Sequence, residues 1–433
     1  MHLFPSSDET IHGVAEALRK GGRTCVSIVE GCLQQIDIWE PRLRAWVSVD
    51  RSGALRRARE LDADLAAGRD RGPLHGIPLG IKDLIDVAGW PTAAGSALLA
   101  NEIATADAPL VNRLREAGAI ILGKTVTTQF ACFDPSVTCN PWNVERTPGG
   151  SSSGSATAVA TGMCLGAVGS QTGGSITRPA SFCGVAGCKP TFGLIPTAGV
   201  YPVSHSLDHP GPIARSVADL ALLMEVLADQ TGLDSAPSLP PHIGRLHGMF
   251  DEKTELAMRQ AFESTCRILA AAGAHFGDAV LPDSFRDVLS AHRQIMLYEL
   301  GEVHRERFAA HPDDYLPGIR GLIEEAARIP DEKYKLARSH QNRLRMEIAG
   351  CFQNYDVLIC PATLGPAPDL STTGDPSFNA PWSYTGLPTV SFPIALSPDG
   401  LPLAIQLIGR ADGEASLFQA ARWCENIVRR DRA

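Results

Sequence analysis

Two glycine-rich turns that carry serines are the segments of this chain best suited to nucleophilic chemistry. They are residues 149–154 (GGSSSG) and 173–175 (GGS). Glycine pairs allow tight turns that expose successive amide hydrogens, and such a nest suits a negatively charged oxygen. Ser175, at the end of the second turn, could attack a carbonyl carbon while the neighbouring amides hold the resulting oxyanion. The apolar segments beside both turns favour this interpretation over flexible surface loops.

A serine nucleophile needs a base, and Lys82 is the candidate. It is one of seven lysines and directly follows the apolar run GIPLGI, which is typical of a short buried strand. A lysine at the end of such a strand loses hydration, which lowers its pKa from about 10.4 and lets the neutral amine accept a proton. Taken alone, a lysine in this position is more typical of the surface. The two serine turns are what make Lys82 the predicted base.

Three other patterns point to different chemistry. Residues 118–125 match the phosphate-binding loop G-x-x-x-x-G-K-[ST], but their middle four residues, AIIL, are typical of a buried strand. Residues 150–154 match the G-x-S-x-G elbow of α/β-hydrolases, with Ser152 as nucleophile; the preceding NVERTPG lacks the required apolar strand, and this remains an alternative. His205 and His209 have the spacing of a helical metal site, but the surrounding prolines predict a solvated loop.

The elements that must position these residues are short apolar strands alternating with helices. This alternation predicts an α/β protein with a mixed, twisted β-sheet covered on both faces by helices. We expect residues 1–70 to be N-terminal helices packed on the core, and residues 71–230 and 354–433 to form that core. A Pro- and Ser-rich linker begins at about residue 231, and the charged segment up to residue 353 is expected to be a helical insertion that shapes the substrate pocket.

The composition of the chain restricts the kinds of binding partner and the cellular compartment that we expect for it. The chain has 433 residues, 44% of them hydrophobic, and 39 basic against 48 acidic side chains give a net charge of −9. The apolar content excludes extended disorder, and the acidic balance argues against nucleic acid or an anionic membrane as the main partner. Eleven cysteines without C-x-x-C pairs fit reduced thiols. With no signal-peptide pattern and no apolar run of about 20 residues, we expect a cytoplasmic protein.

The serine turns lie in a longer pattern, GGSSSGSATAVATG followed by GSQTGGSITRPASFCGVAGCKPTFG. This pattern resembles the signature of the amidase signature family. Further segments resemble the same family: GIPLGIKD, SLDHPGPIARSVADL, and GLPTVSFPI with DGLPLAIQLIG. The similarity covers about residues 70–230 and 355–425, which is the whole predicted core. The resemblance therefore implies the amidase signature fold.

The resemblance also assigns roles to residues. It implies a Ser–Ser–Lys triad in which Ser175 is the nucleophile, Ser151, preceded by a cis peptide bond, relays the proton, and Lys82 is the base. Ser175 would form an acyl-enzyme that water then cleaves, with no metal or organic cofactor. Ser152 would support the loop through hydrogen bonds. Four consecutive backbone amides would hold the oxyanion: those of Thr172, Gly173, Gly174 and Ser175.

Two positions depart from the common family pattern. Gln171 stands where Asp is usual, and the usual arginine is shifted by one place to Arg178. This variant resembles malonamidase-like hydrolases of small amides, in which the arginine holds a substrate carboxylate. A guanidinium suits a carboxylate because it donates two parallel hydrogen bonds. Equally, Arg178 could pair with a nearby acid or cap loop carbonyls, and the sequence leaves both interpretations open.

The expected function is hydrolysis of a small linear amide, carboxylate-bearing or carbamate-type, by this chain alone. The alternative is a glutaminase-type subunit of a tRNA-dependent amidotransferase complex. A non-catalytic relative is disfavoured because all three triad positions are filled. The expected partner is a small-molecule amide, with no nucleic acid or membrane, and a homodimer is one option for the assembly.

Overall fold

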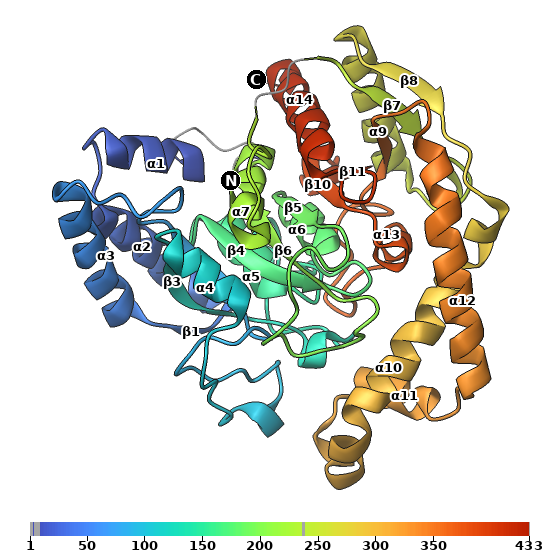
Figure 1. Ribbon diagram of the computed structural model, residues 1–433, viewed down its shortest axis with the longest axis horizontal. Helices are drawn as coiled ribbons and strands as arrows, with labels where there is room; N and C mark the ends of the chain where they lie inside the picture. Colours follow the sequence, from blue (N-terminus) through green and yellow to red (C-terminus); the bar gives the residue numbers. More distant parts are fainter. Residues whose placement is uncertain (1–2, 4–8, 236–238, 433) are drawn as a thin grey trace.

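A mixed β-sheet runs through the centre of the protein in a computed structural model that describes residues 3, 9–235 and 239–432 (Figure 1). Within these residues, eleven strands form the sheet, in the order β1-β3-β2-β4-β6-β5-β10-β11-β9-β7-β8. The strands are β1 (Trp46–Val49), β2 (Pro78–Lys82), β3 (Ile120–Thr125), β4 (Gly166–Gln171), β5 (Ala186–Lys189), β6 (His209–Ala214), β7 (His242–Arg245), β8 (His275–Asp278), β9 (Val357–Pro361), β10 (Thr389–Leu396) and β11 (Pro402–Ile408). The predicted mixed sheet is confirmed.

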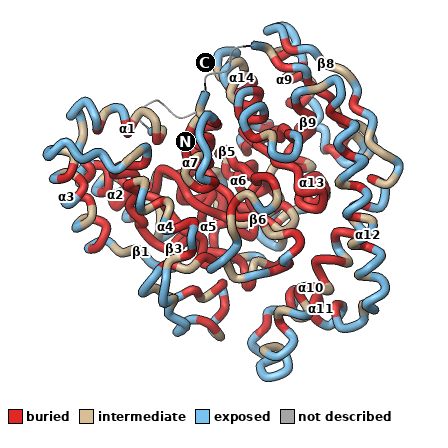
Figure 2. The backbone as a smooth tube through the Cα atoms, viewed as in Figure 1, coloured by how far each residue is buried: buried red, intermediate tan, exposed pale blue. Residues whose placement is uncertain are grey.

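Helices cover both faces of this sheet. Helices α5 and α6 pack on its central strands and on each other, whereas α7, α9 and α14 form a second packed group. Figure 2 shows the central strands, α5 and α6 buried almost throughout, while α12 is largely exposed. The helices are α1 (Ile11–Arg19), α2 (Cys25–Leu43), α3 (Arg51–Ala66), α4 (Pro109–Glu116), α5 (Ser153–Ala160), α6 (Thr177–Cys183), α7 (Val217–Ala228), α8 (Met249–Glu252), α9 (Leu256–Ala271), α10 (Val288–Ala310), α11 (Pro317–Ala326), α12 (Asp331–Glu347), α13 (Ala380–Thr385) and α14 (Glu414–Arg432).

The segment 231–353 holds more than the expected helices. Helices α10, α11 and α12 lie together on the right of Figure 1 and contribute to a second apolar cluster. The same segment also supplies β7 and β8, which extend the sheet through parallel pairing of β7 with β9 and with β8. Residues 236–238 of the expected linker lie outside the described residues. Between the N-terminal helices, β1 pairs antiparallel with β3. The division of the chain into domains stays a prediction.

Two of the competing motifs have structural explanations. The residues that match a phosphate-binding loop form the buried strand β3, as expected. The expectation of a solvated loop is wrong for His209, which is the buried first residue of β6. Strand β6 contains Pro210 and Pro212; it pairs with β4 along its whole length but with β5 only at Ile213 and Ala214. No cluster of metal-ligating side chains occurs in the described part of the chain. No described helix has the length and apolar character that spanning a membrane requires.

Small residues let α5 approach the sheet closely. Its sequence is SGSATAVA, and all but its last residue are buried. A Cβ atom at Gly154 would lie 2.2 Å from the carbonyl oxygen of Ala45 and 2.4 Å from the nitrogen of Val126. The backbone nitrogen of Gly154 also donates a hydrogen bond to the Val126 carbonyl (3.0 Å). This close contact fixes the first turn of α5, and with it the preceding serine turn, against β3.

We therefore expect Gly154→Ala to destabilise the fold by about 3 kcal/mol, the upper range of the cost of overpacking a core. Urea unfolding followed by circular dichroism measures this loss. Gly321→Ala is the matched control, because that glycine is exposed in α11 with open space around it. The control should gain up to about 1 kcal/mol from helix propensity. Equal stability of the two variants would contradict the close packing of α5.

Candidate active site

Parallel pairing brings the predicted base and the second serine turn to one edge of the sheet. Strands β2 and β4 are parallel neighbours with Ile81 opposite Val168. Lys82, the last residue of β2, therefore lies beside the end of β4, where residues 172–175 begin. The first serine turn reaches the same edge because it precedes α5, which packs on both strands. The carboxyl edge of such strands is where open α/β sheets place their ligands.

The Lys82 amine is buried among hydroxyl groups. The side chain is 0% exposed, and its Nζ lies 2.7 Å from Ser151 Oγ and 2.9 Å from Ser170 Oγ. Burial holds the pKa of Lys82 well below its ordinary value near 10.5, with a smaller opposing effect from the charge of Asp208. The amine can therefore lose its proton at lower pH than an exposed lysine and then accept one from Ser151.

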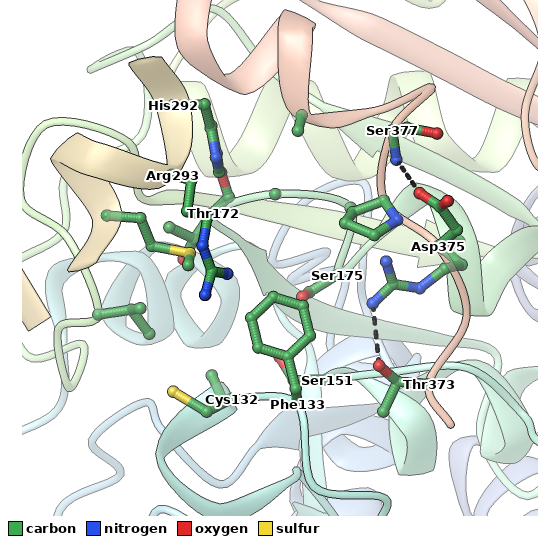
Figure 3. Close-up of a pocket in the computed structure, with 18 of the residues that line it drawn as sticks. Cys132, Phe133, Ser151, Thr172, Ser175, His292, Arg293, Thr373, Asp375 and Ser377 are labelled. Carbon is green, nitrogen blue, oxygen red and sulfur yellow. Dashed lines mark hydrogen bonds between the residues drawn. The ribbon is translucent and has the colours of Figure 1, made fainter. Parts of the chain in front are cut away.

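The two predicted serines face the same cavity. Ser151 follows the cis peptide bond between Gly150 and Ser151, and both Ser151 and Ser175 line the cavity. Figure 3 shows the two serines beside the Phe133 ring. The structure thus brings together all three predicted triad residues. Their catalytic roles stay predictions at this point.

The turn between β4 and α6 presents free amides. In the described part of the chain, no group accepts a hydrogen bond from the backbone nitrogens of Gly173, Gly174 or Ser175. Gln171, at the position usually held by Asp, accepts hydrogen bonds from the next two amides with its side-chain oxygen: Ile176 (2.9 Å) and Thr177 (3.0 Å). A carboxylate could accept the same two bonds, so the substitution preserves the shape of the turn.

Ser152 faces away from the cavity. Its nitrogen donates to the carbonyl oxygen of Ser175 (3.3 Å), and its hydroxyl bonds to the backbone of Ser170. A Cβ atom at Gly169 would lie 2.8 Å from Ser152 Oγ, so the hydroxyl is pressed against β4. Residues before Ser152 form no strand. The elbow interpretation with Ser152 as nucleophile therefore finds no support, whereas its hydrogen bonds suit the predicted supporting role.

Arg178 lies in the wall of the same cavity with only part of its guanidinium satisfied. Its Nη2 donates to the carbonyl oxygen of Gly150 (2.8 Å) and to Thr373 Oγ1 (3.3 Å). The buried Nε and Nη1 have no partner in the described structure. Burial lowers the pKa of Arg178 to about 10, which leaves it charged at neutral pH. The Nη2 atom thus caps a loop carbonyl, and Nε and Nη1 are each free to donate.

The cavity is small and has a polar and an apolar part. Its volume is about 380 Å³. Apart from Arg178, its charged lining residues are Lys253, Arg293 and Asp375, and its apolar wall includes Phe133, Val203, Leu289 and Met296. Several of these side chains come from α10. A pocket of this size takes a small molecule with a short apolar portion.

Sequence reasoning missed four residues around the site. Ser170 is the second hydroxyl partner of Lys82, and Asp208 accepts hydrogen bonds from Thr172 Oγ1 and from two backbone amides. His292 and Ser383 bind the turn after β4 from distant segments. Two of them had a signal, because Ser170 lies in GSQTGGS and Asp208 in SLDHPGP, segments already noticed for their family resemblance.

Comparisons with known proteins agree with this geometry. The amidase family model matches residues 27–418. The putative amidase AmiD of Mycobacterium tuberculosis strain H37Rv is 33% identical over 96% of this chain and 93% of its own. One subunit of the glutamyl-tRNA(Gln) amidotransferase of Nostoc punctiforme is also 33% identical, over 95% of this chain and 96% of its own. Among solved structures, an amidase has a TM-score of 0.90 at 30% identity, covering 96% of this chain and 99% of its own. Peptide amidase from Stenotrophomonas maltophilia has a TM-score of 0.84 at 30% identity, covering 98% of both chains.

If Ser175 is the activated hydroxyl, a fluorophosphonate probe should label the purified chain at this residue. The neutral Lys82 amine, acting through Ser151, makes Ser175 more nucleophilic than the other serines. Peptide mapping by mass spectrometry identifies the labelled residue. Ser175→Ala should abolish labelling and leave the melting temperature unchanged, because it removes one hydroxyl from a turn. Labelling that persists at Ser152 would revive the elbow interpretation.

Proposed function

The chain belongs to the amidase family, and we propose that it acts by itself as a hydrolase of small linear amides that carry a carboxylate. The family supports hydrolysis of an amide bond. The observation that supports the narrower substrate is the buried Arg178 guanidinium, which has two unpartnered donor nitrogens in the wall of the cavity that holds Ser175. A buried charge with unused donors is costly unless a ligand satisfies it.

The proposed reaction starts with a proton relay. Neutral Lys82 takes the hydroxyl proton of Ser151 while Ser151 takes that of Ser175, and Ser175 Oγ forms a bond to the amide carbon. The amides of Gly173, Gly174 and Ser175, and the predicted fourth amide of Thr172, stabilise the oxyanion. The relay then returns the proton to the leaving nitrogen as the C–N bond breaks. Water, deprotonated through the same relay, cleaves the acyl-enzyme and regenerates Ser175.

The cavity supports a substrate with charge at one end. Arg178, Lys253 and Arg293 give its lining three cations against the single carboxylate of Asp375 within the described residues. A carboxylate on the acyl part would accept a charge-assisted hydrogen bond from the free Nη1 of Arg178. The apolar wall would cover the short carbon chain between the carboxylate and the amide. Such a substrate satisfies the guanidinium, which a simple neutral amide leaves unpaired.

The relatives named as subunits of glutamyl-tRNA(Gln) amidotransferase keep a second function under consideration. Glutamine carries a carboxylate for Arg178 and an ammonium group that Asp375 could bind. To separate the two, ammonia release by the purified chain alone is measured on monoamides of dicarboxylic acids, their neutral analogues, carbamates and glutamine. We expect turnover of the acid amides without any partner chain. Turnover of glutamine only, and only with partner subunits added, would favour the amidotransferase function.

Compartment and assembly are part of the same proposal. All eleven cysteines are free and buried, which suits a reducing compartment such as the cytoplasm. A homodimer stays a prediction, to be tested by light scattering of the purified chain.

Arg178→Met should raise KM for an acid amide by about 10-fold or more, since a hydrogen bond between charged groups contributes roughly 1.5–3 kcal/mol. The neutral analogue of equal length should lose much less. Comparing the two substrates in one variant cancels the damage from losing the contact with Gly150, which both share. Steady-state kinetics gives both KM values. Equal losses on both substrates would mean that Arg178 only holds the loop.

The pH profile tests Lys82 as the base. Because burial lowers the pKa of Lys82, kcat/KM should rise with pH and reach its plateau well below pH 10.5. Lys82→Ala should lose about 10²-fold or more in kcat, in line with the removal of a general base. Asp208→Asn is the matched variant: it removes a negative charge that raises the Lys82 pKa, so the rising limb should move to lower pH. An unmoved limb, or near-normal turnover in Lys82→Ala, would refute this assignment.

A further inference from the structure

Three consecutive carbonyl groups of the turn after β4 are each held by a donor. The carbonyl oxygen of Thr172 accepts from His292 Nε2 (2.9 Å), and that of Gly173 accepts from Ser383 Oγ (3.1 Å). The carbonyl oxygen of Gly174 accepts from the backbone nitrogen of Arg178 (2.9 Å). Each carbonyl belongs to the same peptide unit as the next amide along the chain.

This pattern sets the direction of the three free amides. In a trans peptide unit the N–H points opposite to the C=O. The only cis bond in the described chain is the one before Ser151, so the units of this turn are trans. Fixing the Thr172 carbonyl therefore aims the Gly173 amide, and fixing the Gly173 carbonyl aims the Gly174 amide. Both glycines are conformationally permissive, and their peptide units would otherwise rotate easily.

We propose that His292 and Ser383 are positioning residues that orient the oxyanion-binding amides of Gly173 and Gly174. The inference rests on the proposed function, since it assumes that these amides receive the developing oxyanion. Both residues donate to carbonyl oxygens of the turn; His292 also lines the cavity, whereas Ser383 is not among its lining residues. Neither has to contact the substrate to affect the rate.

Ser383 is itself held in the orientation this role requires. Gln171 Nε2 donates to Ser383 Oγ (3.3 Å), which leaves the Ser383 hydroxyl hydrogen for the Gly173 carbonyl. The side-chain oxygen of Gln171 meanwhile accepts from the amides that follow Ser175. Gln171 thus links the two sides of the turn, and α13 contributes Ser383 to the same network.

His292 connects the turn to the cavity wall. It lies on α10, is almost fully buried, and Figure 3 shows its ring next to Thr172. Burial lowers the pKa of His292, so the neutral ring donates from Nε2 to the carbonyl. The same helix supplies Leu289 and Met296 to the apolar wall. The helix that shapes the substrate cavity thereby also orients part of the oxyanion-binding turn.

The test compares variants that remove each donor with variants that keep it. His292→Phe and Ser383→Ala remove the donors, and His292→Gln and Ser383→Thr retain one. Ser290→Ala, an exposed serine on α10, is the matched control. The main measurement is the second-order rate constant for inactivation by a fluorophosphonate, whose phosphoryl oxygen gains charge in the same place as the carbonyl oxygen. Steady-state kcat and KM on the best amide are measured alongside, with melting temperatures.

Each donor-removing variant should lose about 10-fold or more in inactivation rate and in kcat. One oxyanion donor supplies a rate factor of about 10²–10³, and an amide that points in the wrong direction loses part of that factor. KM should stay within about 2-fold, since the interaction strengthens only in the transition state. The donor-keeping variants should recover most of the rate, and the control should match wild type.

Unchanged inactivation rates in both donor-removing variants at wild-type melting temperature would overturn the inference. So would a loss that His292→Gln and Ser383→Thr fail to recover, because that points to packing alone. A wild-type chain that reacts with the fluorophosphonate but cleaves none of the amides would contradict only the proposed substrate. The inactivation rates would then still decide the role of His292 and Ser383.

Discussion

A buried lysine amine that meets hydroxyl groups, with no carboxylate of the described residues in ion-pair contact, is the constraint on which this site depends. Three lysines of the described chain are fully buried, and their surroundings differ. Lys124 forms an ion pair with Asp83 (3.1 Å), and Lys189 donates to backbone carbonyls away from the cavity, with burial lowering its pKa to about 7. Only Lys82 among them has serine hydroxyls at its Nζ beside a cavity. Burial lowers the pKa of a lysine amine, so the amine becomes neutral at lower pH. Next to serine hydroxyl groups that can pass on a proton, the neutral amine can act as a base.

The rest of the structure keeps the Lys82 amine buried and holds it next to the serines that relay the proton. Parallel pairing of β2 with β4 places Lys82 beside the turn that carries Ser175. The close packing of α5, which needs Gly154, holds the serine turn over the same edge. Side chains from α6, α10 and α13 then donate hydrogen bonds to backbone carbonyl groups of the two turns. Each of these contacts is local, yet together they join segments from most of the chain.

The sequence was informative where chemistry and local pattern coincide. The expected strand in GIPLGI, with Lys82 at its end, is β2, and the buried strand expected within residues 118–125 is β3. Four-residue strands such as β8, with the sequence HFGD and no buried residue, leave no apolar pattern to detect. The contacts of His292 and Ser383 could not be predicted from the sequence either, because their partners in the turn lie 120 and 210 residues away along the chain. Such partners are set by the packing of helices on the sheet, which no local motif encodes.

The protonation state of Lys82 is the most direct test of the proposed mechanism. Protein labelled with ¹³C at the lysine ε-carbon contains seven such positions, and Lys82→Ala identifies the signal of interest. Titration by NMR reports the pKa of that amine without reference to any substrate. We predict a midpoint well below the ordinary value near 10.5, with the signal returning toward a charged amine only on acidification. A midpoint at or above 10.5 would show that the amine stays charged at working pH, and it would contradict a neutral lysine as the base.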